Sequence, residues 1–143
     1  MSTLACVEIK AFLPAKDFEV SKRFYAALGF ECRSDVGGVA YFCTGHCAFL
    51  LQDFYQEAWA ENSAMHLLVD DVQAWLAHVE LADVARSFCE SGVKVTPLVV
   101  QAWGLTEFVL IDPAGVCWHI GQNTPGFDAV GKVDPLELPS NLP

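Results

Sequence analysis

The order of predicted strands and helices occurs twice along the 143-residue chain, and this repetition limits the fold more than any single motif. Each half is predicted to run strand, helix, strand, strand, strand. The first half spans about residues 5–54 and the second about residues 64–121. One such unit leaves a face of its sheet uncovered, so we predict that two units pack together. The expected fold is α+β, with two βαβββ repeats that form a curved mixed sheet around a cavity and helices outside.

Capping and turn residues set the boundaries within the first half. Pro14 ends a predicted strand at residues 5–13, and Asp17 and Gly29 then delimit a helix. Two glycine-containing turns separate the three strands that follow. These strands are predicted at residues 30–36, 39–43 and 47–54.

The second half repeats these signals after a polar connector at residues 55–63. Asp70 and Asp71 can cap the helix, and Pro97 makes the strand after it an edge or bulged strand. The elements are predicted as a strand at residues 64–69, a helix that ends at Gly92 and is broken near residues 81–83, and a strand at residues 93–101.

A hairpin at residues 106–121 completes the second half. Asp112-Pro113-Ala114-Gly115 fits a type I turn, because Asp can bond the backbone beyond it and Pro sets the next φ angle. His119 lies near the middle of the closing strand, among apolar residues. By strand alternation, Trp118 is expected to face the helices and His119 the cavity.

Composition excludes several classes of function. The net charge is −10, with eighteen acidic and eight basic residues and no basic stripe, so nucleic-acid binding is not expected. No apolar run reaches the roughly 20 residues of a membrane span, and no signal peptide is evident. The six cysteines are therefore interpreted as free thiols in a cytoplasmic protein. Residues 1–122 are predicted as one domain, and the proline-rich residues 123–143 as an extended tail.

Three stretches, FYAALGFE, MHLLVDDVQAW and QAWGLTEFVLIDPAGVCWHIGQ, resemble the glyoxalase / bleomycin-resistance / extradiol dioxygenase superfamily, also called the vicinal oxygen chelate superfamily. The resemblance covers about residues 5–122 and is strongest to the bleomycin-resistance-like branch. It implies metal-ligand positions at Lys10, Leu51, Ala64 and His119. Only His119 can bind a metal, so neither a metal nor another cofactor is expected. A shifted set of Glu8, Asp53, His66 and His119 would need coordinated moves of about 7 Å.

Nine residues are predicted to bind a ligand: Glu8, Lys10, Phe49, Leu51, Asp53, His66, Trp103, Cys117 and His119. Alternatives stay open for several of them. Lys10 either pairs with a carboxylate or binds an anionic group, since an unpaired buried ammonium is costly. Phe49 suits the core as well as a pocket wall. Cys117 becomes a nucleophile only where its thiolate is stabilised.

The resemblance favours a metal-free, homodimeric binding protein that sequesters a small cationic or aromatic compound such as an antibiotic. The acidic balance agrees with a cationic ligand. One alternative is a divalent-metal-dependent lyase, isomerase, dioxygenase or thiol transferase of the same superfamily. Another is a dimeric scaffold without a ligand.

Overall fold

A computed structural model describes residues 4–124. The first half forms one four-stranded sheet with the order β1-β4-β3-β2, in which β1 runs parallel to β4. Its elements are β1 (Phe12–Pro14), α1 (Phe18–Leu28), β2 (Glu31–Val36), β3 (Val39–Thr44) and β4 (Cys47–Gln52).

The second half forms a separate sheet with the order β5-β9-β8-β6, and the short strand β7 also pairs with β8. As in the first half, its first and last strands are parallel. After the connector helix α2 (Glu57–Glu61), its elements are β5 (Ala64–Leu68), α3 (Val72–Ala82), α4 (Val84–Ser87), a 3₁₀ turn at Cys89–Ser91, β6 (Lys94–Val95), β7 (Val99–Val100), β8 (Leu105–Ile111) and β9 (Cys117–Asn123). The α+β class and the two βαβββ units are thus confirmed.

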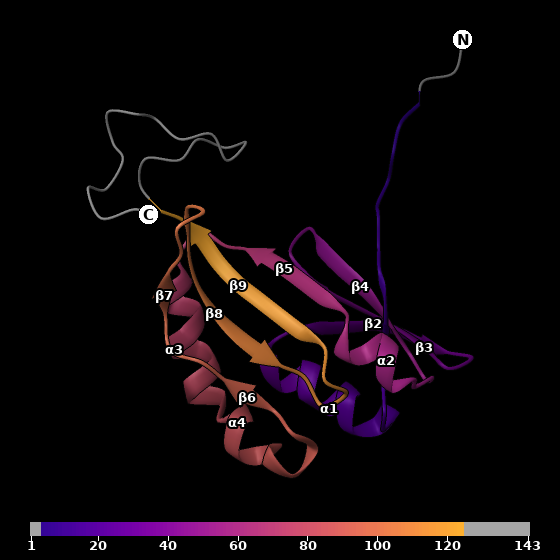
Figure 1. The fold of residues 1–143 in the computed structure, drawn as a ribbon. Coiled ribbons are helices and arrows are strands. Elements are labelled where there is room, and N and C mark those ends of the chain that lie inside the picture. The colour runs from indigo at the N-terminus through magenta and orange to yellow at the C-terminus, as the bar shows by residue number, and fades with distance from the viewer. Residues whose placement is uncertain (1–3, 125–143) are drawn as a thin grey trace.

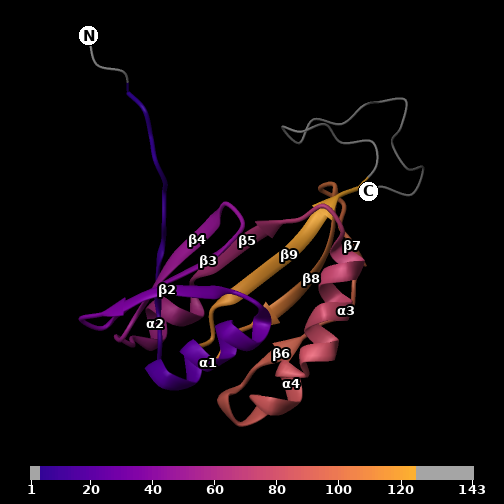
Figure 2. The same cartoon turned by 180° about the vertical axis from the view of Figure 1, so that it is seen from behind.

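Helices α1, α3 and α4 gather on one side of the strands, where the two halves share one apolar core (Figures 1 and 2). Tyr25 of α1 lies at its centre. Its ring centroid is 4.7 Å from that of Phe49 in the first sheet and 5.9 Å from that of Trp118 in the second. Burial of these large rings is the main force that holds the halves together.

The predicted helix caps form at the residues that the sequence indicates. Asp17 accepts a hydrogen bond from the Val20 amide, and Asp71 accepts one from the Ala74 amide. Gly29 ends α1 with φ of 107°, a conformation in which glycine carries no steric penalty. The break predicted near residues 81–83 lies at Asp83, whose φ of 56° separates α3 from α4.

The turn of the closing hairpin ties the second half to α1. The Asp112 carboxylate is buried and accepts hydrogen bonds from the Ala114 and Val116 amides at 2.8 and 2.9 Å. It also accepts one from the Tyr25 hydroxyl, which in turn accepts one from the Trp118 indole at 2.9 Å. Burial raises the pKa of Asp112 despite these donors, and it raises the pKa of Tyr25 as well.

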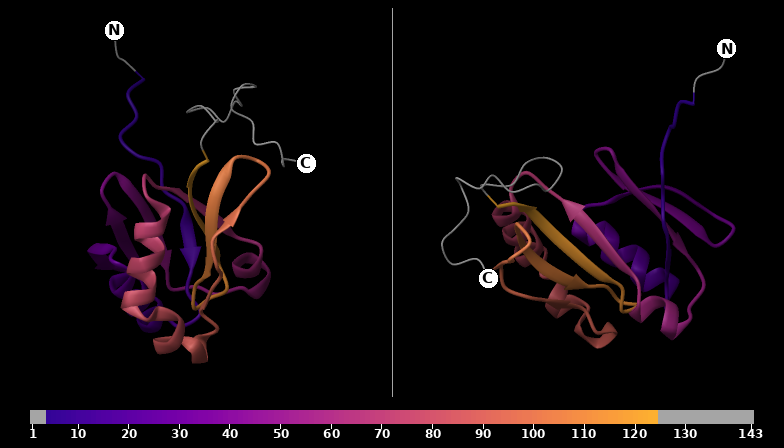
Figure 3. Two further views of the ribbon diagram at one scale, coloured as in Figure 1. Left: turned by 90° about the vertical axis from the view of Figure 1, so that its left-hand side faces the viewer. Right: turned by 45° about the horizontal axis from the view of Figure 1, so that its top comes forward.

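The predicted N-terminal strand is wrong over most of its length. Only Phe12–Pro14 is a strand, and residues 4–11 lead away from the body of the molecule (Figure 3). In the parallel pair, Phe12 lies opposite Leu50, and β4 begins only three residues earlier. Residues before position 9 therefore have no strand partner within the described chain, and Val7 and Ile9 are 100% and 95% exposed.

The closing strand runs two residues further than predicted, because Asn123 is the last residue of β9. The rest of the predicted tail, residues 125–143, lies outside the described residues. Among residues 4–124, no helix is long and apolar enough to cross a membrane.

Candidate functional site

Each sheet has one face against the helices and one face turned away from them, which we call its open face. Alternation along β9 shows the difference: Trp118 and Ile120 are buried in the shared core, whereas Cys117 and His119 are only partly buried. His119 thus faces away from the core, as predicted. Because no helix among residues 4–124 covers the open faces, a ligand or another protein chain can reach them there.

One row of side chains crosses the open face at corresponding positions in both halves. Phe12 lies five residues before the α1 cap Asp17, and His66 lies five before the α3 cap Asp71. In the first sheet the row runs Phe12, Leu50, Tyr41, and in the second it runs His66, His119, Val109. The same backbone positions therefore carry an apolar and aromatic row in one half and two imidazoles in the other.

A polar cluster surrounds His119 on the second open face. Its Nδ1 lies 3.3 Å from Oε1 of Glu107, and its Nε2 lies 3.5 Å from Sγ of Cys117. Glu107 is 3% exposed and also accepts a hydrogen bond of 3.3 Å from the Gln101 amide. It lies over Gly121, where an added Cβ would be 2.9 Å from the Glu107 Cβ. Burial, and then the charge of Glu107, raise the pKa of the Cys117 thiol.

A second polar cluster lies on the first open face. The Tyr41 hydroxyl hydrogen-bonds both carboxylate oxygens of Glu8, at 2.9 and 2.7 Å, and Lys10 Nζ lies 2.8 Å from Glu8 Oε1. Lys10 also lies 4.7 Å from the centre of the Tyr41 ring. Hydrogen bonds from Lys10 and Tyr41 lower the pKa of Glu8, and the bond to Glu8 raises that of Lys10. Of the two roles considered for Lys10, the structure shows the carboxylate pair.

Leu51 is buried in the core, so it does not occupy the cavity position that the resemblance implied. Phe49 is buried there as well, so of the two roles considered for it the structure shows the core one. The pairing of the parallel strands places Leu50, and not Leu51, at the position that corresponds to His119. Leu50 offers no metal donor either.

The remaining predicted residues do not converge on one cavity. His66 is exposed beside His119, whereas Asp53 lies just beyond the end of β4, and Trp103 lies 62% exposed in the loop before β8. Within residues 4–124, no group of three His, Cys, Asp or Glu side chains is arranged to hold a metal ion. The shifted metal site of Glu8, Asp53, His66 and His119 is therefore not assembled in this part of the chain.

Sequence reasoning missed Glu107, Gln101 and Tyr41. A signal for Glu107 was present, because the tight turn at Asp112–Gly115 fixes the register of the hairpin. In that register Glu107 lies opposite Gly121, two residues from His119 on the same face. Tyr41 and Gln101 gave no comparable signal, because their contacts depend on segments that are distant or irregular.

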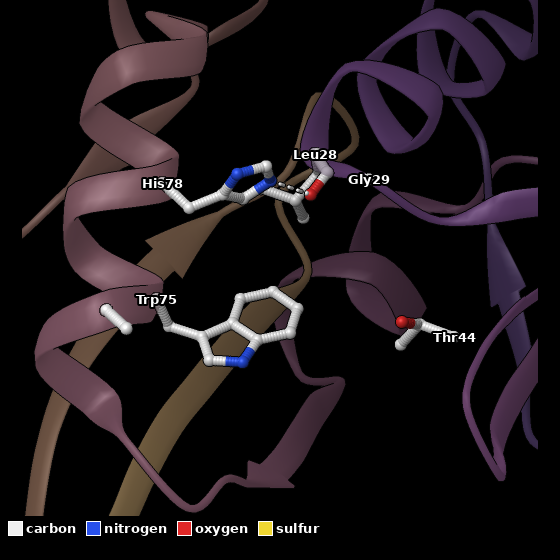
Figure 4. A pocket seen from close by; sticks show the side chains of 6 residues that line it. Leu28, Gly29, Thr44, Trp75 and His78 are labelled. Carbon is white, nitrogen blue, oxygen red and sulfur yellow. Dashed lines mark hydrogen bonds between the residues drawn. The ribbon is translucent and has the colours of Figure 1, made fainter.

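A groove between the halves was also not predicted. It has a volume of about 310 Å³ and lies between α1, α3 and Thr44 (Figure 4). Trp75 and His78 project into it from α3, and the His78 ring is hydrogen-bonded to the Leu28 carbonyl at 2.8 Å. An adjoining pocket of about 470 Å³ shares Thr44 and Trp75 with it.

Comparisons with known proteins establish the fold. No family model matches the chain, and no curated protein matches it. Among solved structures, a bleomycin-binding protein from the bleomycin-producing Streptomyces verticillus, complexed with copper(II)-bleomycin, is 25% identical, with a TM-score of 0.70 over 85% of this chain and 99% of that one. A second bleomycin-binding protein complexed with bleomycin is 20% identical, with a TM-score of 0.68 over 82% and 99% of the two chains.

An enzyme shares the same fold. A lactoylglutathione lyase from Agrobacterium tumefaciens is 19% identical, with a TM-score of 0.59 over 80% of this chain and 92% of that one. The chain therefore has the fold of the glyoxalase / bleomycin-resistance / dioxygenase superfamily, and the likeness to bleomycin-binding proteins confirms the predicted resemblance to that branch. The fold alone does not separate binding from catalysis.

Proposed function

We propose that this protein is a homodimer that binds and sequesters a small aromatic or cationic compound, such as an antibiotic, on its open sheet faces. The likeness to bleomycin-binding proteins supports the ligand class. The observation that carries the proposal is the second open face, where His66, His119 and Glu107 lie beside apolar side chains. No helix of the described part of the chain covers this surface. Such a mixture, apolar with a few placed polar groups, is typical of ligand sites.

Exposed apolar residues support the dimer. Phe12 lies on the first open face and Leu68 on the second, and both are at least half exposed. Val7 and Ile9, in the segment before β1, are almost fully exposed. Exposed apolar surface of this kind commonly marks a contact between proteins. A second copy placed over the open faces would turn each of them into one wall of an enclosed site.

The net charge of −10 favours a cationic ligand over an anionic one. Among the clustered charges of the open faces, Lys10 is already paired with Glu8, whereas Glu107 remains an acceptor beneath His119. The second open face therefore offers a basic ligand imidazoles backed by a buried carboxylate, and the first open face offers aromatic Phe12 and Tyr41 to a flat one.

Isothermal titration calorimetry with metal-free bleomycin, and then with other basic aromatic compounds, tests the binding. We expect saturable binding that weakens at least about tenfold in His119→Ala, because a polar anchor of a buried ligand is lost. His46→Ala, in the exposed turn before β4, is the matched control and should bind normally. Absence of binding by every basic aromatic compound would refute the proposed ligand class.

Analytical ultracentrifugation tests the dimer separately. The wild-type chain should sediment as a dimer, and the double variant Val7→Asp, Ile9→Asp should shift it toward monomer, because two charges would enter an apolar contact. A monomeric wild type at tens of micromolar would refute this part of the proposal. The two experiments fail independently, so each part can be judged alone.

A further inference from the structure

The side chains of Cys117, His119 and Glu107 form a chain of contacts that binding alone does not require. A thiol contacts one nitrogen of an imidazole at 3.5 Å, and a buried carboxylate contacts the other nitrogen at 3.3 Å. We propose that this cluster makes Cys117 a nucleophile toward soft electrophiles, with His119 as its general base and Glu107 as the group that orients the base. The compounds concerned are α,β-unsaturated carbonyl compounds, which Cys117 would capture covalently.

The burial of Glu107 determines which nitrogen of His119 acts as the base. Glu107 is almost fully buried, and its Oε1 also accepts a hydrogen bond from Gln101, which fixes its position. A carboxylate next to Nδ1 favours the tautomer in which Nδ1 carries the proton. Nε2 then holds a free lone pair, and it points at the Cys117 thiol. A nucleophile, a base within hydrogen-bond reach and a third group that orients the base is the arrangement found in thiol and hydroxyl enzymes.

The cluster is rigid and reachable. Cys117 and His119 are two residues apart on β9, the strand held between β5 and β8, so their side chains emerge on the same face. The side chain of His119 is 38% exposed, and Cys117 is partly buried beside it. Capture at this site does not depend on the proposed dimer or on reversible ligand binding.

The surroundings of Cys117 favour addition over acyl transfer. Acyl transfer needs unpaired N–H groups to stabilise an oxyanion. The strand β9 is hydrogen-bonded on both sides, and the Cys117 amide itself donates to the Ser63 carbonyl at 3.1 Å. Conjugate addition needs only a thiol and a group that accepts and returns one proton, and both are present.

The proposed step balances without a co-reactant. The Cys117 sulfur forms a bond to the β-carbon of the electrophile, and its proton passes to Nε2 of His119. The π electron pair of the carbon–carbon double bond moves toward the carbonyl as an enolate. The proton on Nε2 then adds to the α-carbon, which leaves a stable thioether and a neutral imidazole. No oxidant or reductant is consumed.

The charged groups around the thiol define its expected pH dependence. Glu107 approaches from β8, and His66 lies beside His119 on β5, whereas the strand partners of Cys117 itself are Ala64 and Ile111. Burial and Glu107 raise the pKa of Cys117, so a spontaneous thiolate is scarce at neutral pH. Reactivity near pH 7 therefore requires the base, and without it Cys117 should react only in alkaline solution.

The test is the rate of acrylamide addition at each cysteine, measured by peptide mass spectrometry on the intact folded protein between pH 6 and 10. Exposed Cys47 and Cys89 are internal controls. At pH 7, Cys117 should react roughly tenfold faster than either control, since general bases contribute at least that much. His119→Gln should remove this advantage and confine reaction at Cys117 to alkaline pH, and Glu107→Gln should lower it several-fold.

Two results would overturn the proposal. One is a Cys117 rate at pH 7 no greater than those of Cys47 and Cys89. The other is an unchanged Cys117 rate and pH profile in His119→Gln. A general loss of structure would expose the buried Cys43 and raise its rate, so it is distinguished from loss of the base in the same sample. Where His119→Gln does not fold, the wild-type rates and the Glu107→Gln variant decide.

Discussion

The two halves of the molecule share one topology but carry different chemistry on their open faces. In the first half the central row is Phe12, Leu50 and Tyr41, and in the second the corresponding row is His66, His119 and Val109. Hydrogen-bonded strand ladders and the packing against helices determine the backbone in both. Since open-face side chains take no part in that core, they can differ without changing the fold, and function is expected where they differ.

The turns before the last strand of each half also differ. In the first half, Gly45 and His46 form an exposed turn, whereas in the second half the buried Asp112 binds its own turn and Tyr25 of the first half. The second hairpin therefore links the two halves by hydrogen bonds, whereas the first only joins two strands of one sheet. This contrast predicts where mutations destabilise the protein most.

Asp112→Ala should have the largest effect on stability. It removes the acceptor for two backbone amides and the Tyr25 hydroxyl, which are left unpaired in the core. The free energy of unfolding should fall by about 3 kcal/mol, measured by urea denaturation. At the corresponding turn, His46→Ala should change it by less than about 0.5 kcal/mol. Equal losses in the two variants would contradict the contrast between the turns.

Gly121→Ala should cause the next largest loss of stability. An added Cβ would be 2.9 Å from the Glu107 Cβ and 3.1 Å from the Thr106 carbonyl oxygen, so Glu107 has to move. We expect a loss of about 1–3 kcal/mol and a fall in Tm. The rate of acrylamide addition at Cys117 should fall with it. Gln52→Ala, at the corresponding position of the first half, is the control. A Tm of Gln52→Ala as low as that of Gly121→Ala would show that the contact with Glu107 is not the cause.

Exchanging the central residues of the two rows separates function from fold. His119→Leu gives the second half the residue of the first, and it should weaken binding of a basic aromatic ligand at least about tenfold in calorimetry. Its Tm should change little, because His119 is outside the core. Leu50→His makes the reverse exchange and should leave binding through His119 intact. A stronger loss of ligand binding in Leu50→His than in His119→Leu would place the ligand on the first sheet.

The smallest expected effect is the pH dependence of the Glu8 contacts on the first open face. Hydrogen bonds from Lys10 and Tyr41 lower the pKa of Glu8, so these contacts are complete above the usual Glu pKa. They are lost as the pH falls through the lowered value. Carboxyl ¹³C NMR should place the Glu8 midpoint below the usual range, and Tyr41→Phe should move it upward. An unchanged midpoint in that variant would show that the Tyr41 contacts do not form in solution.

The sequence was sufficient for features whose cause is local. Asp17, Gly29 and Asp71 act within a few residues of their own positions, and each capping or turn conformation formed as predicted. The hairpin turn was predictable for the same reason. Its longer-range tie to Tyr25 was not, since no local pattern indicates which residue of α1 reaches a turn 87 residues away.

Errors arose where the cause is nonlocal. In β4 the sequence CAFLLQ is apolar on both faces, so alternation does not reveal which side the helices cover, and the cavity position implied for Leu51 is wrong. Residues 5–11 have the composition of a strand, but β4 begins too late to pair with most of them. Glu107 joins the site across two strands and a turn, and only the register of the hairpin reveals it.

In the proposed function, ligands bind on the open face of the second sheet. The chain has four histidines: His66 and His119 on that face, His46 in an exposed turn, and His78 in the groove between α1 and α3. An NMR titration with metal-free bleomycin follows the chemical shifts of all four imidazoles in one experiment. We expect saturable shifts of His119 and His66 and none of His46 and His78. Shifts confined to His78, or no shift at His119 upon binding, would contradict it.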